Sequence, residues 1–198
     1  MTPTKLRILV VFMLCVCCHI AVQGAQATAP APLIPAAAWA DTLKGGHPRL
    51  LGPKTHLEER RKAFPQYYEM MKTNDSIIAA GVVNALDGVD KAKIDNFIEA
   101  AKADVAKGVT DEHQDTWIRM TEVAQVYDFF YSSISPEDRR AMIEWLNAHL
   151  SAYTQDEGAF HNSTLSKILC YLRVAYATWG DNPKAKDFRD YAISKLYE

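Results

Sequence analysis

One polar loop of this sequence carries residue types that could act together chemically. Residues 155–164 read QDEGAFHNST, and His161 and Asn162 stand where this loop meets the expected start of a helix. Backbone N–H groups and the helix dipole favour an anion at such a position. The two side chains add hydrogen-bonding groups, so a carboxylate fits this place. His161 and Asn162 are therefore the candidate catalytic residues.

Two simpler interpretations of the same loop stay open. Asn162 or Ser163 could only cap the helix while His161 lies in the loop, and spacing alone favours that structural role. Asn162-Ser163-Thr164 also fits the pattern for N-glycosylation, and a glycan on Asn162 would exclude a buried substrate role.

A cluster of aromatic residues is a further candidate, this time for stacking on sugar rings. Its helical spacing assigns most members to the core, although any one ring could still face a ligand. The members are Trp117, Tyr127, Phe129, Phe130 and Tyr131.

Composition and motif content exclude several classes of function. The chain has 198 residues, 48% of them hydrophobic, with 22 Lys and Arg against 24 Asp and Glu, so we expect no nucleic-acid partner. Phosphate-binding glycine loops, zinc-type His and Cys spacings and nucleophile elbows are all absent from the sequence. We therefore predict neither a cofactor nor a metal ion.

The first 27 residues have the order of a secretory signal peptide. Lys5 and Arg7 precede an apolar run over residues 8–18, and Ala25-Gln26-Ala27 supplies small residues for cleavage. The apolar run is too short for a stable membrane span. We expect a secreted or periplasmic protein in which Cys170 is the one remaining cysteine, a small core residue with no disulfide partner.

The segment 28–45 is rich in Ala and Pro, which predicts an extended linker before the folded part at 46–198. In the folded part, Thr55 and Glu58 have capping-box spacing, and Pro65 should interrupt the helix that they open. Asn74 or Asp75 is expected to cap the next helix, which should end before Gly88.

Three longer helical regions follow. Asp90 to Lys107 is amphipathic and ends at Gly108. A second region carries Trp117, Met120, Ala124 and Tyr127 at helical spacing, and Ser135-Pro136 has the pattern of an N-cap followed by Pro at N1. The last pair spans 163–179 and 183–198, separated near Gly180. These patterns predict an all-α fold of antiparallel helical hairpins.

Four segments resemble the heparinase II/III family of polysaccharide lyases. In chain order they are His47-Pro48-Arg49-Leu50-Leu51, Tyr127-Asp128-Phe129-Phe130-Tyr131 with the following Ser135 to Arg140, Phe160-His161-Asn162, and Trp179-Gly180-Asp181-Asn182-Pro183. The resemblance implies an α/α toroid, of which 46–198 would be an N-terminal and truncated portion. The terminal helix is still periodic at Glu198, which also suggests a fragment.

The family cleaves uronic-acid polysaccharides by β-elimination. The resemblance therefore implies an acidic, uronate-containing polysaccharide as partner, with His161 and Asn162 neutralising its carboxylate. The developing enolate places negative charge there, so donors lower the barrier. The Tyr and His that serve the family as base and acid have no matching segment here, and we expect this fragment to be inactive alone.

Two other functions compete with the lyase. Ala175, Gly180, Ala185, Tyr191 and Ala192 resemble one tetratricopeptide-like unit, which would make the protein an exported helical-repeat binding module without catalysis. A toroidal glycoside hydrolase would need two carboxylates across the scissile bond, and Asp156 and Glu157 are adjacent in sequence.

Overall fold

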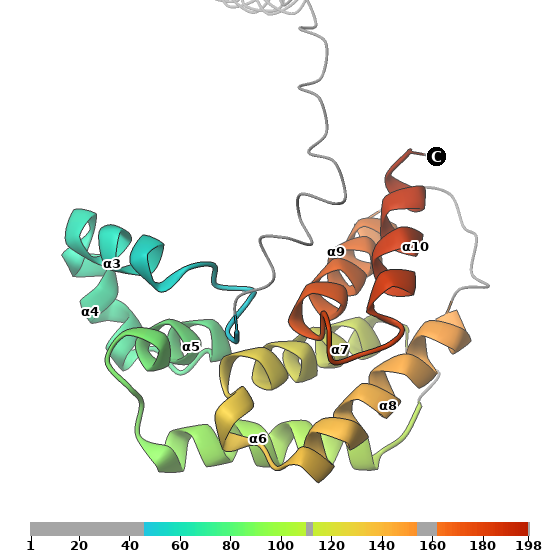
Figure 1. Ribbon diagram of the computed structural model, residues 1–198, viewed down its shortest axis with the longest axis horizontal. Helices are drawn as coiled ribbons and strands as arrows, with labels where there is room; N and C mark the ends of the chain where they lie inside the picture. Colours follow the sequence, from blue (N-terminus) through green and yellow to red (C-terminus); the bar gives the residue numbers. More distant parts are fainter. Residues whose placement is uncertain (1–45, 110–112, 154–161, 198) are drawn as a thin grey trace, which may run out of the picture. The chain divides into compact units, whose positions relative to one another are not determined.

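Most of the described residues of this chain are helical, as the periodicity of the sequence predicts. The computed structural model describes residues 46–109, 113–153 and 162–197, and it contains α-helices and one 3-10 helix but no strand within those ranges (Figure 1). The all-α prediction is confirmed. The predicted signal peptide and linker, residues 1–27 and 28–45, lie outside the described residues.

The helices are separated by short connections. In chain order they are α3 (Lys54–Ala63), α4 (Pro65–Thr73), α5 (Ile77–Leu86), α6 (Lys91–Ala106), α7 (His113–Phe129), η1 (Tyr131–Ser133), α8 (Pro136–Tyr153), α9 (Asn162–Ala177) and α10 (Ala185–Tyr197). None of the described helices combines the length and apolar character needed to cross a bilayer.

Several helices begin or end at the capping residues that the sequence predicts. The Asp90 side chain accepts a hydrogen bond from the Ala92 N–H at the start of α6. Gly108 follows α6 with φ of 72°, a conformation that favours glycine. Ser135 accepts a hydrogen bond from the Asp138 N–H and precedes Pro136, the first residue of α8.

Two predicted caps are wrong. Helix α3 begins at Lys54 after Pro53, without a side-chain cap, so Thr55 already lies within the first turn and does not open the helix with Glu58. Helix α5 is capped by Ser76, whose hydroxyl accepts from the Ala79 N–H. In both places a neighbouring residue is an equally suitable N-terminus for the helix, and the spacing of residues in the sequence does not distinguish between these positions.

Helices α5, α7 and α9 run in the same direction, with their carboxyl ends at one side. Helix α7 contacts both α5 and α9. Near the end of α5, the Asn84 amide donates to the carbonyl of Phe129, the last residue of α7. Arg49 joins Asp128 of α7 to the carbonyl of Ala177, the last residue of α9. The three carboxyl ends therefore meet where the loop at 46–52 enters.

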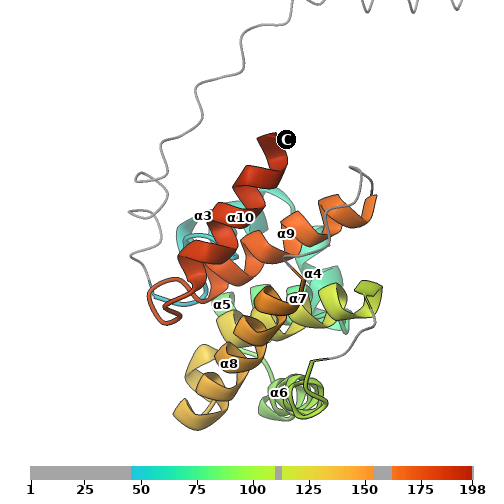
Figure 2. The same cartoon turned by 90° about the vertical axis from the view of Figure 1, so that its right-hand side faces the viewer.

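The intervening helices return the chain and form a second layer. Helix α8 contacts α6, and the Trp145 indole N–H donates to the carbonyl of Gly108. Helices α9 and α10 pack as a hairpin, visible in both orientations (Figures 1 and 2). This arrangement matches the predicted helical hairpins. Closure into a toroid stays a prediction.

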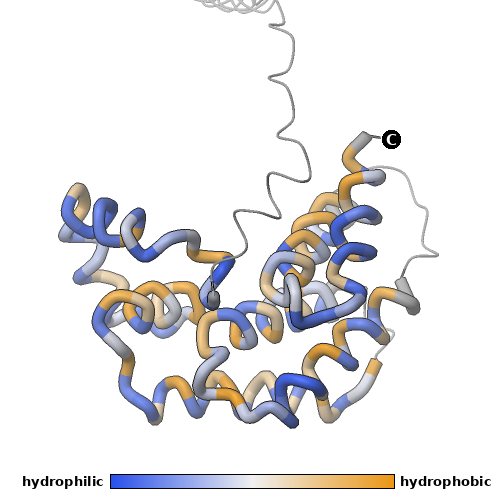
Figure 3. Tube along the Cα trace, viewed as in Figure 1, coloured by the Kyte–Doolittle hydropathy of each residue, from blue (hydrophilic) through white to orange (hydrophobic). Residues whose placement is uncertain are grey.

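The core follows the apolar stripe of α7 and its neighbours. Met120, Val123 and Ala124 are completely buried, and α5 is largely apolar in Figure 3 while α3 is largely polar. Burial of such side chains supplies the main driving force for folding. Cys170 is buried in this core, as expected, and burial raises the pKa of its thiol to about 12.

Candidate functional site

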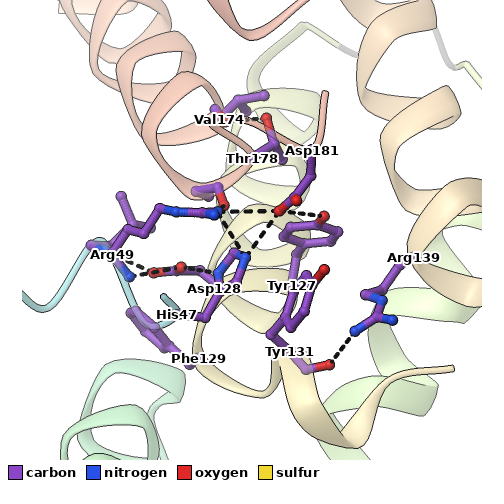
Figure 4. A network of polar contacts seen from close by, with 12 residues as sticks. His47, Arg49, Tyr127, Asp128, Phe129, Tyr131, Arg139, Val174, Thr178 and Asp181 are labelled. Atoms are coloured by element: carbon purple, nitrogen blue, oxygen red, sulfur yellow. Dashed lines mark hydrogen bonds and ion pairs between the residues drawn. The ribbon is translucent and has the colours of Figure 1, made fainter. Parts of the chain in front are cut away.

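A buried carboxylate on α7 holds the loop that precedes α3. Oδ1 of Asp128 accepts hydrogen bonds from Nδ1 of His47 at 2.6 Å and from the backbone N–H of Arg49 at 2.8 Å (Figure 4). Oδ2 accepts from the backbone N–H of Leu50 at 2.7 Å. Asp128 is fully buried, and these three donors replace the water that its charge has lost.

A second carboxylate comes from the turn between α9 and α10. Asp181 accepts hydrogen bonds from Nη1 of Arg49 and from the Tyr127 hydroxyl, both at 3.2 Å, and lies 3.0 Å from Nε2 of His47. Partial burial by itself would raise the pKa of Asp181. The hydrogen bonds and positive charge of His47 and Arg49 outweigh burial, so the pKa is below its usual value.

The hydrogen bonds assign the proton on His47. Nδ1 faces a buried carboxylate that only accepts, so Nδ1 carries hydrogen. Nε2 lies 2.7 Å from Nη1 of Arg49, which only donates, and farther from Asp181. Nε2 therefore lies between a donor, Arg49, and an acceptor, Asp181.

Aromatic rings surround this histidine. The His47 ring stacks on Tyr131 with centroids 3.9 Å apart and meets the edge of Tyr127 at 5.6 Å. The guanidinium of Arg139 lies 4.0 Å from the Tyr131 ring centre, a cation–π contact. Burial and the nearby Asp181 raise the pKa of Tyr127, so this tyrosine stays protonated and does not suit the role of a base.

A groove of about 670 Å³ lies beside this cluster, within the size range of small-ligand sites. The loop at 46–52, the start of α3 and the ends of α5 and α7 form its walls. Its charged and polar lining includes His47, Arg49, Lys54, Asn84 and Asp128. The Asp128 oxygens are occupied by donors and Arg49 is paired with Asp181, so Lys54 is the exposed cation of this lining. An anionic ligand in the groove could pair with Lys54.

Of the two candidate catalytic residues, the structure places only Asn162, and it lies away from this cluster. His161 lies outside the described residues, and Asn162 is the first residue of α9. Ala177, which contacts Arg49, is the last residue of this 16-residue helix, so about 24 Å separate its ends. The structure therefore does not bring Asn162 together with the Asp128 cluster.

The sequence analysis did not predict that His47, Arg49, Asp128 and Asp181 form one hydrogen-bonded cluster. One signal was present: Asp128 stands within an apolar and aromatic run, where a carboxylate needs partners. Four of the five aromatic candidates are buried core residues, and two of the five, Phe129 and the half-buried Tyr131, line the groove.

The residues that the structure describes contain no group of three or more side chains placed to hold a metal ion. Comparisons of this chain with family models, curated proteins and solved structures found no match.

Proposed function

We propose that this chain forms the substrate-binding helical part of an exported polysaccharide lyase, and that the groove beside Asp128 binds uronate units. One observation carries the proposal. Three of the segments that resemble the heparinase II/III family, around His47, Asp128 and Asp181, are far apart in sequence and meet in one hydrogen-bonded cluster. Unrelated short matches would have no reason to converge.

The groove has the chemistry that an acidic sugar requires. The charge of the exposed Lys54 favours a carboxylate, and the Asn84 carbonyl oxygen can accept from a sugar hydroxyl. The charge of Lys54 also attracts an acidic polymer, more strongly at low salt.

In this proposal, the β-elimination takes place at the amino-terminal end of α9, away from the groove. His161 and Asn162 would donate to the uronate carboxylate while the C5 proton is removed and the bond to O4 breaks. That carboxylate takes up charge as the enolate develops, so donors aimed at it lower the barrier. The groove beside Asp128 would bind the polymer and take no part in bond breaking.

Binding and product formation test the proposal together. We would titrate the protein with polygalacturonate, alginate, hyaluronan and heparin, with dextran as the neutral control, and follow unsaturated uronate by its ultraviolet absorbance. We expect binding of at least one acidic polymer that weakens with salt. Binding to none of them at low salt would contradict the proposal, and binding to peptides instead would favour a helical-repeat module.

A matched pair of variants locates the binding site. Lys54 lines the groove, whereas Lys62 lies on the same helix outside it. Lys54→Ser should weaken binding roughly fivefold, as expected for loss of one partly exposed charge contact. Lys62→Ser should leave the affinity within twofold of the parent. Equal effects of the two substitutions would show that the groove is not the binding site.

Export is tested separately. N-terminal sequencing of secreted material should begin after Ala27 if residues 1–27 are a signal peptide. A mature protein that begins at Met1 would contradict this part of the proposal.

A further inference from the structure

A second hollow, of about 380 Å³, lies among α3, α4 and α5. Its lining is mostly apolar and aromatic, and it includes the arginines Arg60 and Arg61 but no carboxylate. Two of its aromatic side chains, Phe64 and Tyr67, are 52% and 57% exposed and meet edge to face at 6.2 Å. Rings this exposed contribute little to the core and remain available to a ligand.

The hollow is adjacent to the groove beside Asp128. Leu57 lines both of them. Along α3, Lys54 on the groove side precedes Leu57 by three residues, and Arg60 on the hollow side follows it by three. Phe64, four residues after Arg60, is the C-cap of the helix. Residues at this spacing share one face of a helix. One face of α3 therefore borders both depressions.

The side chains of the two arginines in the hollow differ in their contacts. Arg61 donates to Asp87 at 2.7 Å, and Asp87 also accepts from the Tyr68 hydroxyl at 2.7 Å, so these three side chains stabilise one another. Arg60 is exposed and makes no ion pair with any residue that the structure describes. Arg60 is thus the cation that a ligand could engage without breaking a contact of the fold.

Charge is unevenly distributed along the chain. Residues 46–73 hold six Lys and Arg against three Glu, a formal charge of +3 in a protein whose total is −2. An excess of +1 remains when Arg49 and Arg61 are counted with their ion-pair partners Asp181 and Asp87. Within this segment, the loop at 46–52 borders the groove, α4 borders the hollow, and α3 borders both. A cationic region with exposed rings is complementary to an acidic polysaccharide, whose sugar rings have apolar C–H faces and whose carboxylates seek cations.

We propose that the hollow between α3 and α4 is a second binding site for the same acidic polysaccharide, occupied by sugar units that continue past Leu57 from the groove beside Asp128. Phe64 and Tyr67 contact sugar faces, and Arg60 pairs with a carboxylate. This inference rests on the proposed function, because it extends the ligand of that groove.

The test is the dependence of affinity on oligosaccharide length. Size-fractionated oligosaccharides of the four acidic polymers, from disaccharide to dodecasaccharide, are titrated by calorimetry into the parent protein and into Arg60→Ser/Tyr67→Ala. The matched control is Lys62→Ser/Met70→Ala. It removes a cation from α3 and a 63% exposed apolar side chain from α4, neither of which lines the hollow.

In the parent, affinity should rise at least tenfold between short and long oligosaccharides. Arg60→Ser/Tyr67→Ala should lose this tenfold gain in affinity but should still bind short oligosaccharides as tightly as the parent does. The control variant should keep the gain. Arg60→Glu, which reverses the charge without touching the rings, should lose the gain as well. Thermal unfolding of each variant verifies that it is folded.

Three results would overturn the inference. The first is that Arg60→Ser/Tyr67→Ala keeps the gain in affinity with oligosaccharide length, and the second is that the control variant loses as much of that gain. The third is that vesicles with 30% phosphatidylserine displace bound oligosaccharide from the parent but not from Arg60→Ser/Tyr67→Ala, which would assign the hollow to a membrane surface. The proposed function fails differently, because then no oligosaccharide of any length binds.

Discussion

Nδ1 of His47 donates a 2.6 Å hydrogen bond to the buried carboxylate of Asp128, a residue 81 positions later in the chain. The same carboxylate accepts the backbone N–H groups of Arg49 and Leu50. One side chain of α7 thus determines where the loop at 46–52 lies and how the wall of the groove is formed.

Replacing Asp128 by Asn should destabilise the protein by about 3 kcal/mol, measured by urea unfolding. The amide keeps one accepting oxygen but places an NH2 group against a donor, so at least one buried donor loses its partner. Asp75→Asn is the control, because the Asp75 side chain is 97% exposed and pairs only across the surface with Lys93. Its effect should stay within about 0.5 kcal/mol. Similar losses in both variants would refute the buried hydrogen-bonded cluster.

Acid should weaken the fold partly through Asp181. Its pKa is lowered from the usual 3.8, so the ionised form favours the folded state at neutral pH. This stability is present above the unfolded pKa and is lost as pH falls through the lower folded pKa. In Asp181→Asn, the decline of the unfolding free energy below about pH 4 should be shallower than in the parent. Superimposable pH profiles would contradict the prediction.

Gly81 permits the close approach of α5 to α7. A Cβ atom at this position would lie within 3.0 Å of three ring atoms of Phe129, which is itself buried. Gly81→Ala should therefore cost about 1–3 kcal/mol through overpacking, despite the better helix propensity of Ala. Gly46→Ala is the control, since nothing lies within 4 Å of its Cβ position. A more stable Gly81→Ala protein would show that α5 and α7 are packed less tightly.

The thiol of Cys170 should be unreactive in the folded protein. Burial raises its pKa to about 12, so almost no thiolate is present at pH 8. A chromogenic disulfide reagent should label protein lacking residues 1–27 only after unfolding in urea. Ser132→Cys, at an exposed position, supplies a reactive thiol for comparison. Rapid labelling of Cys170 without unfolding would contradict its place in the core.

His161→Ala and Asn162→Ala test the catalytic proposal, in the form of the protein that shows lyase activity. Loss of one donor to the developing enolate should cost about 2.7–4 kcal/mol of barrier, or roughly a hundredfold or more in turnover. Asn162 is the first residue of α9, so Asn162→Ala also changes the first turn of that helix. Ser163→Ala, at the next position of the same turn, is the control for that effect, and thermal unfolding is measured beside turnover. Unchanged turnover in both variants would remove the pair from the active site.

Local sequence determined most of the helices of this protein. Asp90 and Gly108 bound α6, and Ser135 with Pro136 begins α8, because caps and turn residues act within one helical turn of themselves. The same local logic failed for Thr55 and Glu58, since Pro53 already provides a start for α3.

Only the tertiary structure decided the site. His47 meets Asp181 across 134 positions of sequence, and this contact requires the turn after α9 to come beside the loop before α3. No spacing rule reaches across such a separation, because the approach depends on how α5, α7 and α9 pack with their carboxyl ends together. Packing therefore gathered His47, Asp128 and Asp181 into one cluster, and it placed Asn162 at the far end of α9.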